Sequence, residues 1–273
     1  MTLESTVAFS LQSRTYPVHT DPLQSRMKRL FLEGFSVLDV AEALPSFDAD
    51  AEADDVRTRM IQAELPVIGV RREGIVVGYA LQDELANGTC GDHMRQFTVA
   101  NVVGESASLQ QVIECLDRSD HCFVSLLGQV AGVVTRGDMQ KPPIRMWLFG
   151  VVTIIELQLT QVIELNYPDG SWTGAISRGR LKKAEALRDE RLRRREPARL
   201  IDCLQFADKA QVVLAEAASR ETFGFTSKRD GERAMKDLQS LRNNLAHAQD
   251  IVAVNWDAIV SLSRRLDRIM ARI

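Results

Sequence analysis

Two short polar patterns in this sequence contain residues whose types and spacing could do chemistry. The later one is Arg242-Asn243-Asn244-Leu245-Ala246-His247. A histidine whose pKa lies near its ordinary value of about 6.5 can accept or donate a proton at neutral pH. An arginine can hold phosphate oxygens while negative charge builds in a transition state. These groups suit cleavage of RNA by its own 2′-hydroxyl, which predicts activity on RNA and none on DNA.

Helical geometry limits how the three candidate catalytic residues, Arg242, Asn243 and His247, can cooperate. Asn243 lies four positions before His247, on the same helix face, where it could orient the imidazole. Arg242 lies about 140° around the axis from His247. Both reach one phosphate only through the long arginine side chain or if the helix ends near His247. The alternative is structural, because Arg242 and His247 could complement the C-terminus of their helix.

The earlier pattern is Gly132-Val133-Val134-Thr135-Arg136-Gly137-Asp138, at the end of an expected strand. A carboxylate such as Asp138 can accept hydrogen bonds from two adjacent hydroxyls, as a ribose presents them. A strand end that leads into a helix also leaves backbone N–H groups free for phosphate. The alternative is that Thr135 and Asp138 only cap the following helix.

The elements before this pattern form an internal repeat. Residues 66–70 and 75–79 predict a β-hairpin rich in β-branched residues, and residues 122–126 and 130–135 predict a second one. An apolar helical stripe over 109–116, with Ser108 placed to cap it, precedes the second hairpin. A weaker stripe at Val56, Met60 and Ala63 precedes the first. The order of helix, strand and strand therefore occurs twice.

This repeat resembles the CBS module, which normally occurs as a tandem pair. The resemblance covers residues 23–140, with copies at about 36–90 and 91–140, and leaves residues 1–22 as a loose tail. It implies that Asp138 binds ribose hydroxyls, Thr135 contacts ribose or phosphate, and the backbone of Gly132, Val133 and Val134 reads adenine. The first copy has Leu81 and Glu84 at the hydroxyl and carboxylate positions. The resemblance thus implies one good site per pair, for AMP, ADP, ATP or S-adenosylmethionine.

From residue 141 onward the apolar periodicity becomes helical. We expect helices from Pro142 to the turn at 166–170, over 177–195, over 198–219, over 230–248, and a last one from about Trp256 to Ile273. Five helices in about 130 residues predict an antiparallel bundle. The expected class is α+β, with a CBS pair followed by an all-α domain.

The helical half resembles the HEPN family over about residues 145–273, because the Arg242-to-His247 motif falls in a late helix. In active members the domain dimerises, two motifs face each other, and RNA is cut without a metal or other catalytic cofactor. The resemblance therefore implies a nucleotide-regulated endoribonuclease of the toxin or defence type that acts as a homodimer. The alternative function is a non-catalytic sensor or scaffold whose bundle dimerises or recruits a partner.

Charge is distributed unevenly along the chain. Residues 1–177 hold 13 basic and 23 acidic residues, a net charge of −10, whereas residues 178–273 hold 21 and 14, a net charge of +7. A basic half is typical of surfaces that meet polyanions. The candidate RNA-facing residues are Arg191, Arg193, Arg194 and Arg195. The alternatives are a solvated surface or attraction between the two halves.

Other features narrow the function classes. The four cysteines form no CxxC pair, so the sequence predicts neither a disulfide framework nor a zinc ribbon, and it favours a reducing cytoplasm. No secretory signal is evident, and the most apolar run, at 146–157, is too short to cross a membrane. No metal site is expected. The sequence contains no Walker, GxSxG or GxGxxG motif. It therefore lacks the motif residues on which a phosphoryl-transfer, esterase or dehydrogenase function would rest.

Overall fold

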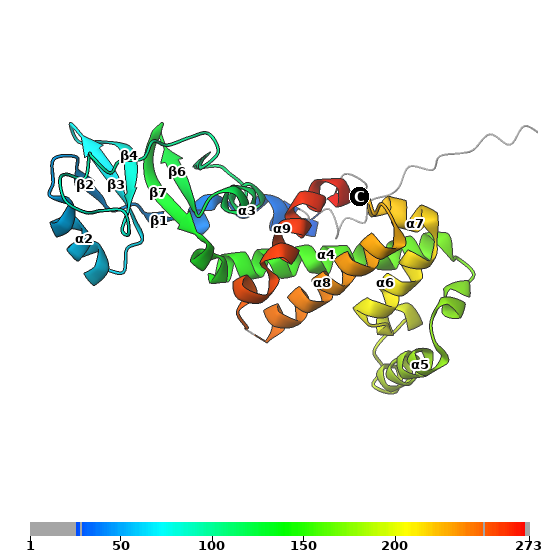
Figure 1. Ribbon diagram of the computed structural model, residues 1–273. Helices are drawn as coiled ribbons and strands as arrows, with labels where there is room; N and C mark the ends of the chain where they lie inside the picture. Colours follow the sequence, from blue (N-terminus) through cyan, green and yellow to red (C-terminus); the bar gives the residue numbers. More distant parts are fainter. Residues whose placement is uncertain (1–25, 28, 248, 271–273) are drawn as a thin grey trace, which may run out of the picture.

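The computed structural model describes residues 26–27, 29–247 and 249–270. The chain is a mixed α+β protein in which the described strands and two α-helices lie in the first half, and the second half is helical (Figure 1). The expected tail at residues 1–22, and the first residues of the expected CBS pair, lie outside the described residues.

Two units of the same topology form the first half, which confirms the predicted internal repeat. In each unit a short strand, a helix and a hairpin follow one another, and the short strand pairs in parallel with the first hairpin strand. The first unit contains β2 (Ser46–Asp48), α2 (Ala53–Gln62), β3 (Val67–Arg72) and β4 (Ile75–Leu81). The second unit contains β5 (Val102–Gly104), α3 (Leu109–Arg118), β6 (His121–Leu126) and β7 (Gln129–Thr135).

Local chemistry explains why these elements form where the sequence predicts them. Both hairpins turn through two residues with positive φ, Glu73-Gly74 and Leu127-Gly128. Such turns match the right-handed twist of paired strands. The cap predicted for α3 is also present, since the Ser108 hydroxyl accepts from Gln111 N at 3.3 Å and the Gln111 side chain accepts from Ser108 N at 2.9 Å.

A short strand that precedes the first unit in the sequence belongs to the sheet of the second unit. Strand β1 (Glu42–Ala43) pairs antiparallel with β7, so the second sheet has the order β1-β7-β6-β5. Just before it, the 3₁₀ turn η2 (Val37–Asp39) is tied to the same unit by a bond from Val37 N to Ala107 O of 2.8 Å. A strand of two residues shows no alternation, which is why the sequence did not reveal β1.

An apolar cluster joins the two sheets. Leu44 and Val67 from the first part of the chain pack with Phe123 and Val133 of the second unit. The Tyr79 ring lies 4.6 Å from that of Phe123 between centroids. The two units therefore form one packed pair.

The second half is a helical domain that β7 enters with almost no linker. The 3₁₀ helix η3 (Arg136–Gln140) follows β7 directly, and α4 begins two residues later. The described α-helices are α4 (Pro142–Asn166), α5 (Arg178–Arg193), α6 (Phe206–Ala215), α7 (Ala217–Thr222), α8 (Lys228–Ala246) and α9 (Ile251–Met270). Among the described residues, α4 is one helix long and apolar enough to cross a membrane, but most of its apolar stretch is buried in the protein.

The prediction of a single helix over 198–219 is wrong. This stretch contains the 3₁₀ helix η5 (Leu200–Cys203), then α6 and α7, so the described part of the bundle has six α-helices rather than five. The break before α6 is stabilised by Asp208, whose carboxylate accepts from Gln205 N at 3.3 Å and restarts the helix. The break after α6 lies at Glu216, which is extended at φ −99° and ψ 142°.

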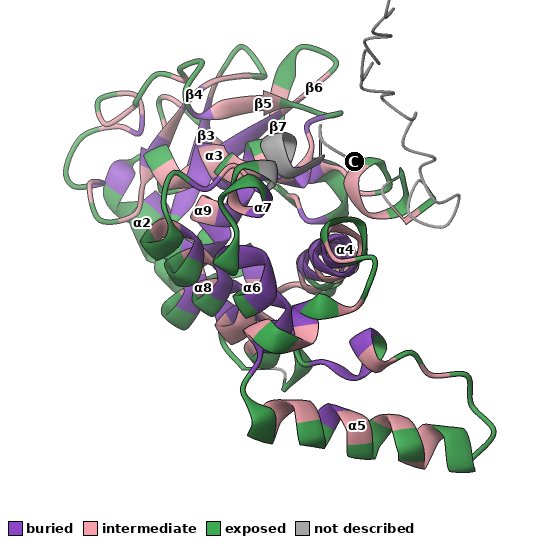
Figure 2. Ribbon diagram, turned by 90° about the vertical axis from the view of Figure 1, so that its right-hand side faces the viewer, coloured by how far each residue is buried: buried purple, intermediate pink, exposed green. Residues whose placement is uncertain are grey.

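Helix α5 stands apart from the rest of the bundle (Figure 2). Only Ala184 is buried among its residues. Its first turn is fixed to α6 because Arg180 Nε lies 2.7 Å from the nearly buried carboxylate of Asp208. The other residues of α5 are exposed or half-buried, and the helix also packs on η5 (Leu200–Cys203).

Candidate functional site

Thr135 and Asp138, the predicted nucleotide-binding pair, meet at the junction of β7 and η3. One carboxylate oxygen of Asp138 accepts from Thr135 N at 2.6 Å and from the Thr135 hydroxyl at 2.9 Å. Asp138 is 9% exposed. In this structure the two residues are thus arranged as a cap, which is the geometry of the structural alternative.

Lys141 occupies the other carboxylate oxygen of Asp138. Its Nζ lies 2.7 Å from Asp138 Oδ1 and 2.8 Å from Glu42 Oε1, and it donates to Val40 O at 2.8 Å. Partial burial lowers the pKa of Lys141, but its bonds to Asp138 and Glu42 outweigh this and raise the pKa above its ordinary value. A ribose that binds Asp138 therefore competes with Lys141 and Thr135 for the carboxylate oxygens.

The backbone of the signature is only partly free. Gly132 and Val133 pair with β6 on one side and with β1 on the other, because β7 is a central strand. Val134 pairs with Cys122 of β6, and on its other side it lies beyond Glu42, the first residue of β1. Of the three signature positions, Val134 is therefore the one that β1 leaves uncovered.

The corresponding position in the first unit is built differently. Leu81 supplies no hydroxyl, and Glu84 forms an ion pair with Arg95. Arg95 also pairs with Tyr79 through backbone bonds of 2.7 and 3.0 Å. The prediction of one good site per pair stays a prediction that the side chains at this position favour.

In the bundle, Arg242 belongs to a cluster of charged residues from three helices. Its Nε lies 3.6 Å from Glu156 Oε2 of α4, and Glu156 Oε1 lies 3.3 Å from Lys209 Nζ of α6. The Lys209 side chain is 8% exposed, whereas that of Arg242 is 44% exposed. Glu156 is thus shared by two cations, and Arg242 is the one of the two that reaches solvent.

His247 lies at the point where α8 stops. The helix ends at Ala246, and His247 is its C-cap, with its backbone N–H donating to Asn243 O at 3.1 Å. Asn243 and His247 are both exposed. The condition that the helix must end near His247 is therefore met in this structure.

A different arginine satisfies the end of α8. Arg145 of α4 donates to the carbonyl oxygens of Asn244 at 3.1 Å, Leu245 at 3.2 Å and Gln249 at 2.9 Å. This guanidinium supplies the positive charge that a helix C-terminus favours. Arg242 is thus directed to Glu156 rather than to these carbonyls.

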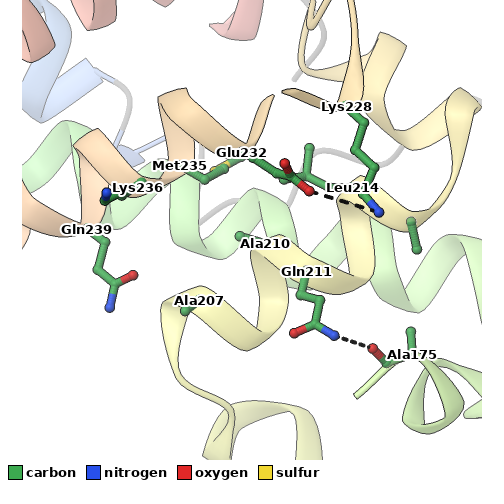
Figure 3. Close-up of a pocket in the computed structure, with 11 residues that line it drawn as sticks. Ala175, Ala207, Ala210, Gln211, Leu214, Lys228, Glu232, Met235, Lys236 and Gln239 are labelled. Carbon is green, nitrogen blue, oxygen red and sulfur yellow. Dashed lines mark hydrogen bonds and ion pairs between the residues drawn. The ribbon is translucent and has the colours of Figure 1, made fainter. Parts of the chain in front are cut away.

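A groove lies between α6 and α8 (Figure 3). Its volume is about 550 Å³, and small apolar side chains such as Ala207 and Ala210 form much of its wall. Its polar residues are Gln211, Lys228, Glu232, Lys236 and Gln239. Lys228 is 3.9 Å from Glu232, and Gln211 donates to Ala175 O at 2.8 Å.

Helical spacing connects this groove to the motif. Lys228, Glu232, Met235, Gln239 and Arg242 succeed one another at intervals of three or four, so they share one face of α8. The sequence analysis missed the groove because its two walls come from segments that only the tertiary structure brings together. The detectable signal was the row of alanines in 207–215.

The predicted RNA-facing arginines are exposed or half-buried at the end of α5. Arg193 and Arg194 share Glu190, at 2.5 and 3.0 Å, whereas Arg191 and Arg195 have no ion pair among the described residues. The structure brings none of the four to the groove walls. Within the described part of the chain, no three His, Cys, Asp or Glu side chains are grouped to hold a metal ion.

Comparison with known proteins gives partial fold similarity only. No family model matches the sequence, and no curated protein is significantly similar. Solved structures with similar parts include CBSX2 of Arabidopsis thaliana in complex with AMP, at 19% identity over 38% of this chain and 93% of that one, with a TM-score of 0.35. The CBS domain of a bacterial CNNM/CorC family Mg²⁺ transporter in complex with ATP matches at 20% identity over 45% and 97%, with a TM-score of 0.36. An uncharacterized conserved protein from Pyrococcus horikoshii matches at 14% identity over 39% and 90%, with a TM-score of 0.36.

Proposed function

We propose that the first half of the chain is a CBS pair that senses an adenine nucleotide and controls a HEPN-type ribonuclease in the second half. The observation that carries the proposal is the continuity of β7, η3 and α4. The predicted ligand residues Thr135 and Asp138 lie at the start of this segment, and Glu156, which holds Arg242, lies further along α4. A ligand at one end is thus connected to the candidate catalytic arginine by a single rigid helix.

The sensing site is proposed at Asp138 and Thr135. Ribose hydroxyls would take the place of Lys141 or of Thr135 on the carboxylate, and Lys141 would remain close enough to meet a phosphate. Calorimetry with AMP, ADP, ATP and S-adenosylmethionine tests this. Asp138→Asn, which keeps an oxygen for the cap, should weaken binding by about tenfold or more through loss of a charged hydrogen bond. The matched control is Asp120→Asn, whose carboxylate is largely exposed; equal affinity in both variants would place the site elsewhere.

The catalytic proposal assigns proton transfer to His247 and phosphate binding to Arg242. The half-exposed guanidinium of Arg242 supports it, because this group shares its carboxylate with Lys209 and could bind a phosphodiester from solvent. Asn243 is proposed to assist His247. On a gel, with a chelator present, the wild type should cut RNA and should not cut a DNA of the same sequence. His247→Ala should abolish cutting, whereas His93→Ala in the first unit should retain it; undiminished cutting by His247→Ala would exclude the nuclease.

A second function is favoured by the ion pair between Arg242 and Glu156, which occupies part of the guanidinium. In this function the bundle recruits a partner or dimerises, and the nucleotide controls that contact. Retained assembly and nucleotide binding without any RNA cleavage would support it. In either function we place the protein in the reducing cytoplasm as a homodimer, with its four cysteines free, and we assign the nuclease form to the toxin or defence class.

A further inference from the structure

The turn between α8 and α9 carries His247. It is held by side chains from η3 and from the first turn of α4. Arg145, in the first turn of α4, contacts three carbonyls on the two sides of His247, those of Asn244, Leu245 and Gln249. These bonds are between 2.9 and 3.2 Å long. These bonds tie the first turn of α4 to the backbone on both sides of His247.

Gln140 ties the same turn to η3. Its side-chain oxygen accepts from Arg145 at 3.2 Å and lies 3.5 Å from Ile251 N, and its amide donates to Asp250. Asp250 in turn caps α9, accepting from Val252 N at 2.8 Å and from Ala253 N at 2.9 Å. Gln140 thus joins η3, the first turn of α4 and the start of α9 in one network.

The predicted ligand residues lie in the same short segment. Asp138 is two positions before Gln140, and Lys141, which bonds Asp138 at 2.7 Å, is the next residue after it. Arg136, between Thr135 and Asp138, places its guanidinium 5.1 Å from the ring centroid of Trp256 in α9 and donates to Leu116 O at 3.1 Å. Asp138 therefore lies in the same segment, residues 135–145, that contacts the turn with His247 through Gln140 and Arg145.

We propose that Gln140 and Arg145 are positioning residues that make the placement of His247 depend on the nucleotide at Thr135 and Asp138. The inference rests on the proposed function for the ligand and for the role of His247. When ribose hydroxyls replace Lys141 or Thr135 on Asp138, η3 and the start of α4 adjust, and Arg145 carries with it the carbonyls of Asn244, Leu245 and Gln249. Coupling of this kind needs two arrangements that the ligand distinguishes, rather than a long pathway.

Hydrogen exchange measured by mass spectrometry on the full chain tests the inference. In the wild type, saturating AMP or ATP should change exchange in peptides that cover residues 244–253 by about threefold or more, since these amides report local opening of the turn. In Arg145→Gln and in Gln140→Ala this response should disappear, while calorimetry shows nucleotide affinity within about twofold of the wild type.

Arg220 offers a matched control, because it donates to Leu214 O and Ala215 O at 2.8 and 3.2 Å and thus caps a different helix. Arg220→Gln should leave the nucleotide response at 244–253 intact. Arg145→Lys, which keeps a positive donor, should restore part of the response and guards against misfolding of Arg145→Gln. A wild type that binds nucleotide without any change at 244–253, or a response that persists in both variants, would overturn the inference alone. Failure of AMP and ATP to bind the wild type would overturn it together with the proposed sensing function.

Discussion

Glu156 serves two cations, and the consequences of losing it differ for the two. Lys209 is nearly buried and has Glu156 as its ion-pair partner among the described residues, whereas Arg242 is half-exposed and can turn to solvent. A buried ammonium without a partner is costly, because water cannot replace the lost carboxylate. The carboxylate is therefore needed for stability on one side and for placement of Arg242 on the other.

We expect Glu156→Gln to lower the free energy of unfolding by about 2–4 kcal/mol, since it removes the charge from a largely buried pair. Urea denaturation monitored by circular dichroism measures this. The control is Glu164→Gln, also on α4, whose ion pair with Arg199 is exposed and should contribute at most about 1 kcal/mol. Equal losses in the two variants would contradict the role given to burial.

Asp230 should make the bundle sensitive to acid. Hydrogen bonding from Arg265, whose NH2 lies 2.7 Å from Asp230 Oδ1, is the main cause that lowers the pKa of this carboxyl to about 2. Because the folded pKa lies below the unfolded value of about 3.9, the stabilisation is complete above pH 4 and is lost as pH falls toward 2. The contribution should be about 1–2 kcal/mol after allowance for solvent screening.

Unfolding free energies measured between pH 2 and pH 6 test this expectation. Asp230→Asn should be less stable than the wild type at pH 6, and the difference should shrink as the pH approaches 2. Asp257→Asn, which alters an exposed carboxylate on α9, provides the comparison. A difference between Asp230→Asn and the wild type that stays constant across this range would contradict the linkage.

At the scale of elements, α8 organises the candidate site. One face carries the groove residues and Arg242, and its last residue precedes His247. The helix is fixed at its start by Ser227, whose hydroxyl accepts from Asp230 N at 3.1 Å, and at its end by Arg145. The positions of the groove and of the motif are thus set together.

If the groove guides RNA to Arg242, then Lys228→Glu with Lys236→Glu should weaken binding of a fluorescent single-stranded RNA by about tenfold, because two phosphate contacts are lost. Fluorescence anisotropy at low salt measures this. The same charge change on α5, Arg193→Glu with Arg194→Glu, should have a smaller effect, since both arginines already share Glu190. A larger loss in the α5 variant would instead favour the surface of α5 as the RNA contact.

The elements that the sequence predicts well are those fixed by residues close together in the chain. Both hairpins follow from β-branched runs around two-residue turns, and α3 follows from Ser108 and its apolar stripe. The break at 204–205 was not predictable from periodicity, because apolar residues continue through it and the capping role of Asp208 is one of several that an aspartate can have. The Lys209, Glu156 and Arg242 cluster depends on three helices distant in sequence, so only the fold reveals it.

At the scale of the whole molecule, the two halves share a long boundary. Helix α9 packs against α3 and η3, and Arg264 of α9 forms an ion pair with Asp117 of α3. Ser263, which is fully buried, donates to Gln110 O at 3.4 Å across the same boundary. The helical domain is therefore docked on the second unit of the pair rather than tethered to it.

This docking predicts a reciprocal effect between the two ligands. If AMP changes the affinity for a non-cleavable, 2′-deoxy-substituted RNA by some factor, the RNA must change the affinity for AMP by the same factor. We expect a factor of about 5–150, the usual range of such coupling. Calorimetric titration of each ligand in the presence and absence of the other gives both values. If the affinity for AMP is the same with and without RNA, and the affinity for RNA is the same with and without AMP, the two halves do not communicate.

The early placement of β1 has a consequence for any fragment of the protein. Residues 42–43 cover the outer side of β7. A fragment that starts at the boundary between the two repeats would therefore leave the outer side of β7 unpaired. It would also lack the Val40 carbonyl, which accepts a hydrogen bond from Lys141, and the Glu42 carboxylate, which forms an ion pair with Lys141. Unpaired strands of this kind pair with strands of other molecules, so such a fragment should aggregate on expression. Fragments that keep residues 36–43 should be soluble and monodisperse.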